Sequence, residues 1–89
     1  MVTKPSLVNW YIYLARCRDN SLYTGITTEL SRRTLEHNSV QGGAKYTKSR
    51  QPITIIYSEL VHSKSEALKR EAMIKRLTRT QKLELIDKI

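Results

Sequence analysis

Two apolar runs separated by a short polar stretch open the chain and predict a β-hairpin. The first run, residues 10–16, carries aromatic and aliphatic side chains at successive positions, which is typical of a strand covered on both faces. Turn-forming residues 18–21 follow, and residues 22–26 form the return strand. Because side chains alternate along a strand, Tyr13 and Tyr23 share a face only if the connecting loop has an odd number of residues. A two-residue turn would place them on opposite faces.

A helical pattern comes directly after the hairpin. We expect this helix to be capped by Thr27 or Thr28, whose hydroxyl groups can accept hydrogen bonds from the first turn. Glu29 would then lie in the first turn, where the helix dipole favours an anion. The helix is expected to end at about Asn38.

The stripe of this helix that faces the hairpin contains polar side chains. Leu30, Arg33, Thr34 and His37 recur at helical spacing. Burying an arginine head costs several kcal/mol unless a counter-charge or a ligand compensates it, so the stripe indicates a cleft rather than a dry core. The alternative is that Arg33 extends to water and that His37 is an ordinary hydrogen-bonded histidine at a helix end.

The middle of the chain, residues 38–52, has no clear periodicity and predicts a long connection with little structure of its own. Gly42 and Gly43 permit close backbone approach. Basic and aromatic side chains in this segment are candidates for contacts with a phosphate backbone, namely Lys45, Tyr46, Lys48 and Arg50. The alternative is a solvated loop whose charges keep the protein soluble.

The last part of the chain predicts a third strand and two helices. Residues 53–58 are rich in β-branched side chains and indicate the strand. Ser63 and Glu66 fit a capping box, in which each side chain binds the other's backbone amide. Thr78 can cap a final short helix that packs against the sheet through Leu83, Ile86 and Ile89.

One carboxylate falls within the apolar arc of the helix that follows Ser63. At about 100° per residue, Glu71 lies in the arc of Ala67, Leu68 and Ile74, whereas Glu66 projects from the opposite side. A carboxylate in this position is expected to have a partner. Two partners are open: a buried ion pair with Arg33, or a divalent cation.

Composition and charge narrow the class of partner. Sixteen Lys and Arg against eight Asp and Glu give a net charge of +8, which indicates a polyanionic partner and favours nucleic acid over a membrane. The single Cys17 cannot form an internal disulfide, so a reducing cytoplasm is expected. Residues 1–9 lack an apolar run of signal-peptide length. We expect one domain over residues 1–89, with an N-terminal extension of nine residues and a core from about residue 10.

The order and spacing of these motifs resemble the GIY-YIG nuclease superfamily. Residues 11–13 (Tyr-Ile-Tyr) and 23–25 (Tyr-Thr-Gly) are similar to its two motifs, and Arg33 and His37 follow at fitting distances. Residues 43–47 and 66–71 also resemble its small, single-domain, YhbQ-like branch. Two positions depart from the usual pattern, because Tyr11 replaces a glycine and Thr24 replaces an isoleucine or valine.

The resemblance implies an α/β fold with a small three-stranded antiparallel sheet flanked by helices. It implies hydrolysis of DNA phosphodiester bonds, with an expected role in DNA repair or recombination, by a catalytic set of Tyr13, Tyr23, Arg33, His37 and Glu71. Glu71 would hold one Mg²⁺ or Mn²⁺ ion, and Tyr11, Ile12 and Gly25 would belong to the structural motif. Two other functions remain as alternatives: a non-catalytic nucleic-acid-binding module and a basic adaptor. Nucleases of this superfamily usually have a separate domain or a protein partner that gives specificity, and we expect only one domain here.

Overall fold

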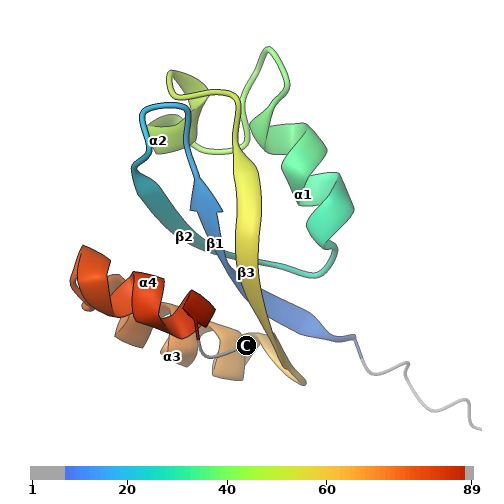
Figure 1. Cartoon of the computed structure of the whole chain (residues 1–89). Coiled ribbons are helices and arrows are strands. Elements are labelled where there is room, and N and C mark those ends of the chain that lie inside the picture. Colours follow the sequence, from blue (N-terminus) through green and yellow to red (C-terminus); the bar gives the residue numbers. More distant parts are fainter. Residues whose placement is uncertain (1–7, 88–89) are drawn as a thin grey trace, which may run out of the picture.

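The computed structural model describes residues 8–87, and its centre is a three-stranded antiparallel sheet with helices on both faces (Figure 1). The strands are β1 (Trp10–Arg16), β2 (Leu22–Thr27) and β3 (Thr54–Val61), arranged in the order β2-β1-β3. The four central residues of β1, from 12 to 15, are fully buried. The sequence-based expectation of a strand covered on both faces is therefore confirmed, and so is the expected fold class.

The hairpin loop sets the register that the two tyrosines need. Arg16 pairs with Leu22, so the loop between them has five residues, an odd number. Tyr13 lies opposite Gly25, and Ala15 lies opposite Tyr23, which puts both tyrosines on one face of the sheet.

Helix α1 (Leu30–His37) begins later than expected because its cap is a glutamate. The two carboxylate oxygens of Glu29 accept hydrogen bonds from the backbone amides of Ser31 and Arg32, at 3.0 and 2.8 Å. Thr27 accepts only the amide of Glu29, at 3.1 Å. The prediction of a threonine cap with Glu29 in the first turn was wrong, since the longer side chain reaches two free amides at once.

The segment between α1 and β3 is more ordered than expected. It contains a short helix, α2 (Lys45–Lys48). Four residues are too few to show a helical pattern of apolar side chains, so the sequence did not indicate this helix. The side chain of Asn38 binds the backbone of Ile53 through both its oxygen and its nitrogen, at 2.7 and 2.9 Å, and so closes the segment at its base. Strand β3 then begins one residue after the expected start and continues three residues beyond the expected end.

Helices α3 (Lys64–Lys75) and α4 (Arg79–Asp87) follow β3 at one end of the sheet (Figure 1). Ser63 caps α3 as expected, by accepting the amide of Glu66 at 3.1 Å. The reciprocal bond differs, because Glu66 accepts the amide of His62 and not that of Ser63. Thr78 caps α4, and its hydroxyl accepts the amide of Gln81 at 3.2 Å.

Two hydrophobic clusters hold the sheet between its helices. The cluster on the α3 and α4 side consists of Ile12, Leu14, Ala67 and Ile74. The partly buried side chains that α4 adds are Leu85 and Ile86; Leu83 and Leu68 are exposed, contrary to expectation. Ile89 and most of the expected N-terminal extension lie outside the described residues. Among residues 8–87, no helix is long and apolar enough to cross a membrane.

Candidate functional site

A buried tyrosine and a buried histidine form the centre of the candidate site. Tyr13 on β1 and His37 at the end of α1 are both fully buried, and the Tyr13 hydroxyl lies 2.7 Å from Nε2 of His37. Arg33, one helical turn before His37, donates from Nε to the same hydroxyl oxygen at 3.2 Å. Helix α1 thus presents two of the polar side chains of its inward stripe, Arg33 and His37, to one phenol group.

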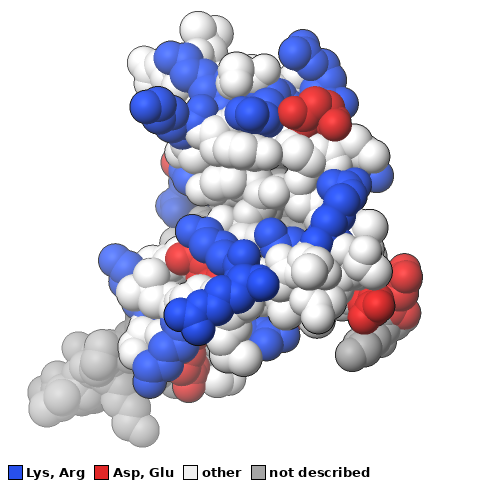
Figure 2. All heavy atoms as spheres, turned by 90° about the vertical axis from the view of Figure 1, so that its left-hand side faces the viewer, with Lys and Arg blue, Asp and Glu red and all other residues white. Residues whose placement is uncertain are grey.

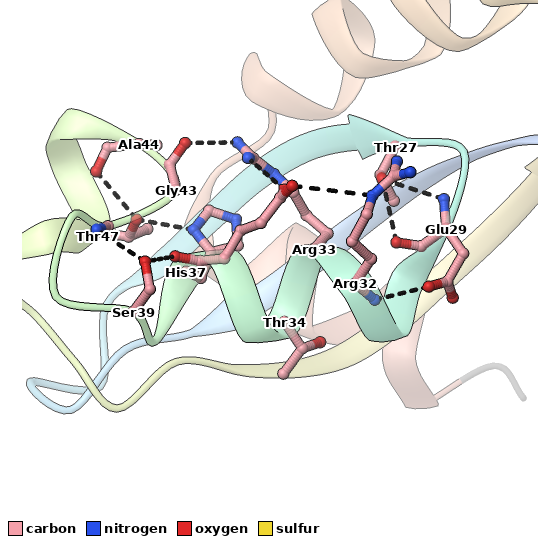
Figure 3. Close-up of polar contacts among 12 residues, drawn as sticks. Thr27, Glu29, Arg32, Arg33, Thr34, His37, Ser39, Gly43, Ala44 and Thr47 are labelled. Atoms are coloured by element: carbon pink, nitrogen blue, oxygen red, sulfur yellow. Dashed lines mark hydrogen bonds and ion pairs between the residues drawn. The ribbon is translucent and has the colours of Figure 1, made fainter.

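The direction of the hydrogen bonds follows from a second set of contacts. Thr47 on α2 donates its hydroxyl proton to the carbonyl of Ala44 at 3.2 Å, since a carbonyl can only accept (Figure 3). The contact between that hydroxyl and Nδ1 of His37, at 2.8 Å, then requires Nδ1 to carry the proton. Nε2 is left as an acceptor, so Tyr13 donates its phenolic proton to His37.

Burial fixes the charge of these two groups near neutral pH. Desolvation, reinforced by the positive charge of Arg33, lowers the pKa of His37 to about 4. Desolvation also raises the pKa of Tyr13 to about 12, and it outweighs the hydrogen bond and positive charge of Arg33, which act in the opposite direction. Tyr13 is therefore a neutral phenol and His37 a neutral imidazole at pH 7.

Arg33 is held by three partners at the edge of the buried pair. In addition to Tyr13, it donates to the carbonyl of Gly43 at 2.8 Å (Figure 3). It also donates to the carboxylate of Glu36 at 3.1 Å. Its ion-pair partner is Glu36, and the expected alternative of an ion pair with Glu71 is wrong. The side chain keeps 24% of its surface exposed.

Two glycines make room for the buried pair. A Cβ atom at Gly25 would lie 2.5 Å from the hydroxyl oxygen of Tyr13, and one at Gly43 would lie 2.9 Å from Nδ1 of His37. Neither buried partner has space to retreat. The glycine of the second motif and the glycine before α2 are therefore steric requirements of this site.

Tyr23 and Tyr46 extend the site towards the surface. The Tyr23 ring meets His37 edge-on at 5.4 Å between centroids, and it stacks with Tyr46 at 6.1 Å. Arg50 covers one face of Tyr46, with its guanidinium carbon 3.9 Å from the ring centroid, and pairs with Asp19 of the hairpin loop at 3.1 Å. Arg50 thereby ties α2 to the hairpin.

The other expected nucleic-acid contacts and motif residues take separate places. Lys45 and Lys48 are exposed on α2. Tyr11 is half-buried on β1, and Ile12 belongs to the cluster on the α3 and α4 side of the sheet.

Glu71 stands apart from the tyrosines, histidine and arginine. Its carboxylate is 18% exposed and pairs with Lys75 on the same helix at 3.6 Å. The charge of Glu71 contributes to the raised pKa of Tyr13, although burial is the main cause, so the two groups interact through space. Within residues 8–87, no group of three or more His, Cys, Asp and Glu side chains could hold a metal ion. Glu71 fits a divalent cation only as a single carboxylate ligand, with water and substrate oxygens completing the shell.

Thr47 and Glu36 are parts of the site that the sequence reasoning missed. Glu36 lies on α1 three residues after Arg33, a spacing at which oppositely charged side chains pair. Thr47 lies ten residues after His37, and no periodic pattern links the two. The only indication in the sequence was the pair of glycines before α2. They suggested that the backbone approaches another group closely, but not that this group is His37.

Comparisons with known proteins agree on one family. The model of the GIY-YIG catalytic domain matches residues 9–84 of this chain. A UPF0213 protein of Staphylococcus haemolyticus is 51% identical over 86% of this chain and 93% of its own length, and one of Desulfotalea psychrophila is 49% identical over 86% of this chain and 70% of its own. A solution NMR structure of a UPF0213 protein from Bacillus halodurans has a TM-score of 0.56 at 40% identity, covering 89% of this chain and 83% of that one.

Proposed function

Since this chain belongs to the GIY-YIG catalytic domain family, within its UPF0213 or YhbQ-like branch, we propose that it is an endonuclease that hydrolyses phosphodiester bonds in DNA. The family is one of nucleases, which makes nucleic acid the expected substrate. The net charge of +8 supports a polyanionic substrate.

The observation that carries the proposal is the directed chain from Arg33 through Tyr13 to His37. Tyr13 is fully buried, so the proposed step requires the Arg33 edge of the site to open as the phosphate binds. An attacking water then passes a proton to the phenolic oxygen of Tyr13 while the phenolic proton moves to Nε2 of His37. The water oxygen bonds to phosphorus, the bond from phosphorus to the leaving sugar oxygen breaks, and that oxygen takes a proton from solvent. Because the pKa of Tyr13 is about 12, Tyr13 passes a proton on rather than standing ready as a phenolate.

Arg33 has two roles in this scheme. Its guanidinium group binds the phosphate oxygens, where negative charge grows in the transition state. A phosphate bound to Arg33 also offsets the positive charge that lowers the proton affinity of His37. Tyr23, whose ring packs against His37, orients the attacking water.

Glu71 is the residue that would hold Mg²⁺ or Mn²⁺. A divalent ion bound there would supply positive charge to the scissile phosphate and its leaving oxygen.

The test is a cleavage assay on plasmid, single-stranded, flapped and branched DNA with Mg²⁺ or Mn²⁺. Glu71→Gln is compared with Glu66→Gln, a matched change on the same helix. We expect metal-dependent cleavage by the wild type and by Glu66→Gln, and none by Glu71→Gln. Arg33→Ala should lower the rate on the order of 100-fold. Full activity in Glu71→Gln or in Arg33→Ala would contradict the role assigned to that residue.

The position of Glu71 supports a second candidate, a nucleic-acid-binding module without catalysis. Glu71 forms an ion pair with Lys75. Within the described part of the chain it makes no hydrogen bond or ion pair with Tyr13, Tyr23, Arg33 or His37. Such a module would bind nucleic acid equally well with and without a divalent ion, and it would cut none of the substrates above. Its affinity would fall in Lys45 or Lys48 variants and would depend strongly on salt.

A further inference from the structure

Helix α2 carries the hydroxyl group that orients His37, yet it has little structure of its own. It is a single turn of four residues, and no side chain in the described part of the chain caps its first amides. A helix this short is unstable by itself in water, because the cost of forming the first turn is recovered only as the helix grows. The position of Thr47 on Nδ1 of His37 therefore depends on contacts between α2 and the rest of the protein.

Arg50, just beyond the end of α2, contacts the hairpin loop. Its Nε donates to the carboxylate of Asp19 at 3.1 Å, and its backbone carbonyl accepts the amide of Arg18 at 2.8 Å. Its other contacts return to α2, where Nη1 donates to the carbonyl of Tyr46 at 2.7 Å and the guanidinium group covers the Tyr46 ring. An exposed ion pair alone is worth little, so the connection depends on all of these contacts acting together.

The carboxylate of Asp19 is oriented by its own loop. Oδ1 accepts the amide and the hydroxyl group of Ser21, at 3.1 and 2.6 Å, which leaves Oδ2 to accept from Arg50. These bonds from Ser21, with a smaller contribution from Arg50, hold the pKa of Asp19 below its usual value. Asp19 is therefore ionised near neutral pH, and the hairpin presents a fixed negative charge to Arg50.

Two routes lead from this ion pair to His37. Thr47 follows Tyr46 on α2 and accepts the hydrogen bond from Nδ1 at 2.8 Å. Tyr46 also stacks with Tyr23, with 23° between the ring planes, and the Tyr23 ring meets His37 edge-on. A shift of α2 away from the hairpin would disturb both contacts of the histidine.

A phosphate backbone has other basic partners on this side of the molecule. Figure 2 shows basic side chains at the end that holds α2 and, below an uncharged band, over α3 and α4. Lys45 and Lys48 are exposed on α2. Arg50 differs from them, because only 34% of its side chain is exposed and its Nε faces Asp19. A phosphate at Nε would have to displace that carboxylate.

We propose that Arg50 is a positioning residue, which clamps α2 to Asp19 and so keeps the hydroxyl group of Thr47 on Nδ1 of His37. The inference rests on the proposed function, because the tautomer of His37 matters for the transfer of the phenolic proton. It gives Arg50 a role other than the expected contact with a phosphate backbone.

Removal of the carboxylate distinguishes the two roles. If Arg50 binds a phosphate, Asp19→Ala frees its guanidinium group and strengthens DNA binding, whereas Arg50→Gln weakens binding. If Arg50 is a clamp, both variants release α2, and we expect each to lower kcat on the order of tenfold while KM changes by less than about threefold. The double variant should be no slower than the slower single variant, since either change alone removes the clamp.

Cleavage is measured on the substrates named above, and binding is measured in EDTA with a fluorescent DNA oligonucleotide. Asp87→Ala removes the same charge from an exposed position on α4 and is the matched control. It should keep the wild-type kcat.

The ¹⁵N NMR spectrum of His37 provides a signature that needs no cleavage. We expect the proton on Nδ1 in the wild type and a mixture of tautomers in Arg50→Gln and in Asp19→Ala. The amide of Lys48, which bonds to the carbonyl of Ala44, should also exchange with solvent faster in both variants. A residue that only stabilised the fold would lower the midpoint of urea unfolding and leave the spectrum of the folded protein unchanged.

Three results would overturn the inference. They are an unchanged His37 spectrum in both variants, an unchanged kcat in both variants of an active enzyme, and tighter DNA binding by Asp19→Ala at an unchanged kcat. None of these would contradict the proposed nuclease. If the wild type cleaves no DNA, the proposed function fails, while a changed spectrum in both variants still supports the clamp on His37.

Discussion

The hydroxyl group of Thr47 determines which nitrogen of His37 carries the proton. It donates to the carbonyl of Ala44, so it accepts from Nδ1, and Nε2 stays free to accept from Tyr13. A histidine in the other tautomer would donate to Tyr13 and could not take its proton. Thr47 is therefore a positioning residue, one step removed from the proposed reaction.

Thr47→Val should lower the cleavage rate on the order of tenfold or more, by analogy with other side chains that orient a functional histidine. Thr47→Ser keeps the hydroxyl group and should restore most of the rate. The ¹⁵N NMR spectrum of His37 should show the proton on Nδ1 in the wild type and a mixture of tautomers in Thr47→Val. A wild-type spectrum with the proton on Nε2 would contradict the proposed direction of transfer.

His37 should make folding sensitive to acid. Its pKa falls from about 6.5 in the unfolded chain to about 4 in the fold, so the unfolded state binds the proton first as the pH drops. The stabilisation is complete above pH 6.5 and is lost between pH 6.5 and 4, with a total of about 3 kcal/mol.

Urea unfolding at several pH values in this range measures the effect. The pH dependence should be flatter in His37→Gln than in the wild type, although the variant is less stable at pH 7. The control is His62→Gln at an exposed position, which should keep the wild-type slope. Equal slopes in His37→Gln and the wild type would contradict the neutral, buried histidine.

Single residues of the site differed in how far sequence could predict them. The stripe of α1 indicated that Arg33 and His37 face the hairpin, and the family resemblance grouped them with the two tyrosines. The sequence left open the loop length, which puts Tyr13 and Tyr23 on one face. Thr47 was missed because its contact joins two segments with no shared periodicity. The partner of Glu71 was also missed, since a position on a helix face does not determine the distance to a side chain on another element.

At the scale of elements, the sequence predicted which segments are strands and helices better than where they end. The ends depend on single side chains, as at α1, where Glu29 replaces the expected threonine cap. Helix α2 was not predicted, because four residues are too few for a periodic pattern. Strand β3 continues beyond Ser58 because its pairing with β1 extends to Val61 opposite Trp10, a long-range partner that the local pattern cannot reveal.

The cap of α1 should contribute measurably to stability. Glu29→Ala leaves the amides of Ser31 and Arg32 without their protein partner and should lower the free energy of unfolding by about 1 kcal/mol. Urea denaturation at pH 7 measures this loss. Glu84→Ala, at an exposed position within α4, is the control and should change stability by less than about 0.5 kcal/mol. A loss as small as that of the control would show that water replaces the cap at no cost.

At the scale of the whole molecule, charge and fold act together. The family resemblance predicted the sheet with its flanking helices, and composition predicted the positive charge. Neither predicted that α3 and α4 bring Lys75 and Lys82 to a cleft on the outer side of β2 that Leu22, Tyr23, Thr24 and Tyr46 also line. That arrangement depends on how the helices pack around the sheet (Figure 1).

The salt dependence of binding should reveal which lysines contact the phosphates of a single-stranded nucleic acid. Each phosphate contact with a single strand adds about 0.7 to the slope of log affinity against log salt concentration. Lys82→Gln should reduce that slope by about 0.7, while Lys64→Gln, at the far end of α3, should leave it unchanged. Titrations of a fluorescent 12-nucleotide single strand between 50 and 200 mM NaCl provide the measurement, in the range where such contacts dominate. Equal slopes for both variants would show that Lys82 makes no phosphate contact.

The burial of Tyr13 in the central strand affects how the protein can change over generations. Tyr13 helps to hold the sheet together through its ring, and its hydroxyl group takes part in the proposed reaction. Most replacements there would lower the amount of folded protein in a cell before they altered chemistry. Lineages that no longer need the activity are therefore expected to retain this tyrosine, and its presence alone does not identify an active enzyme.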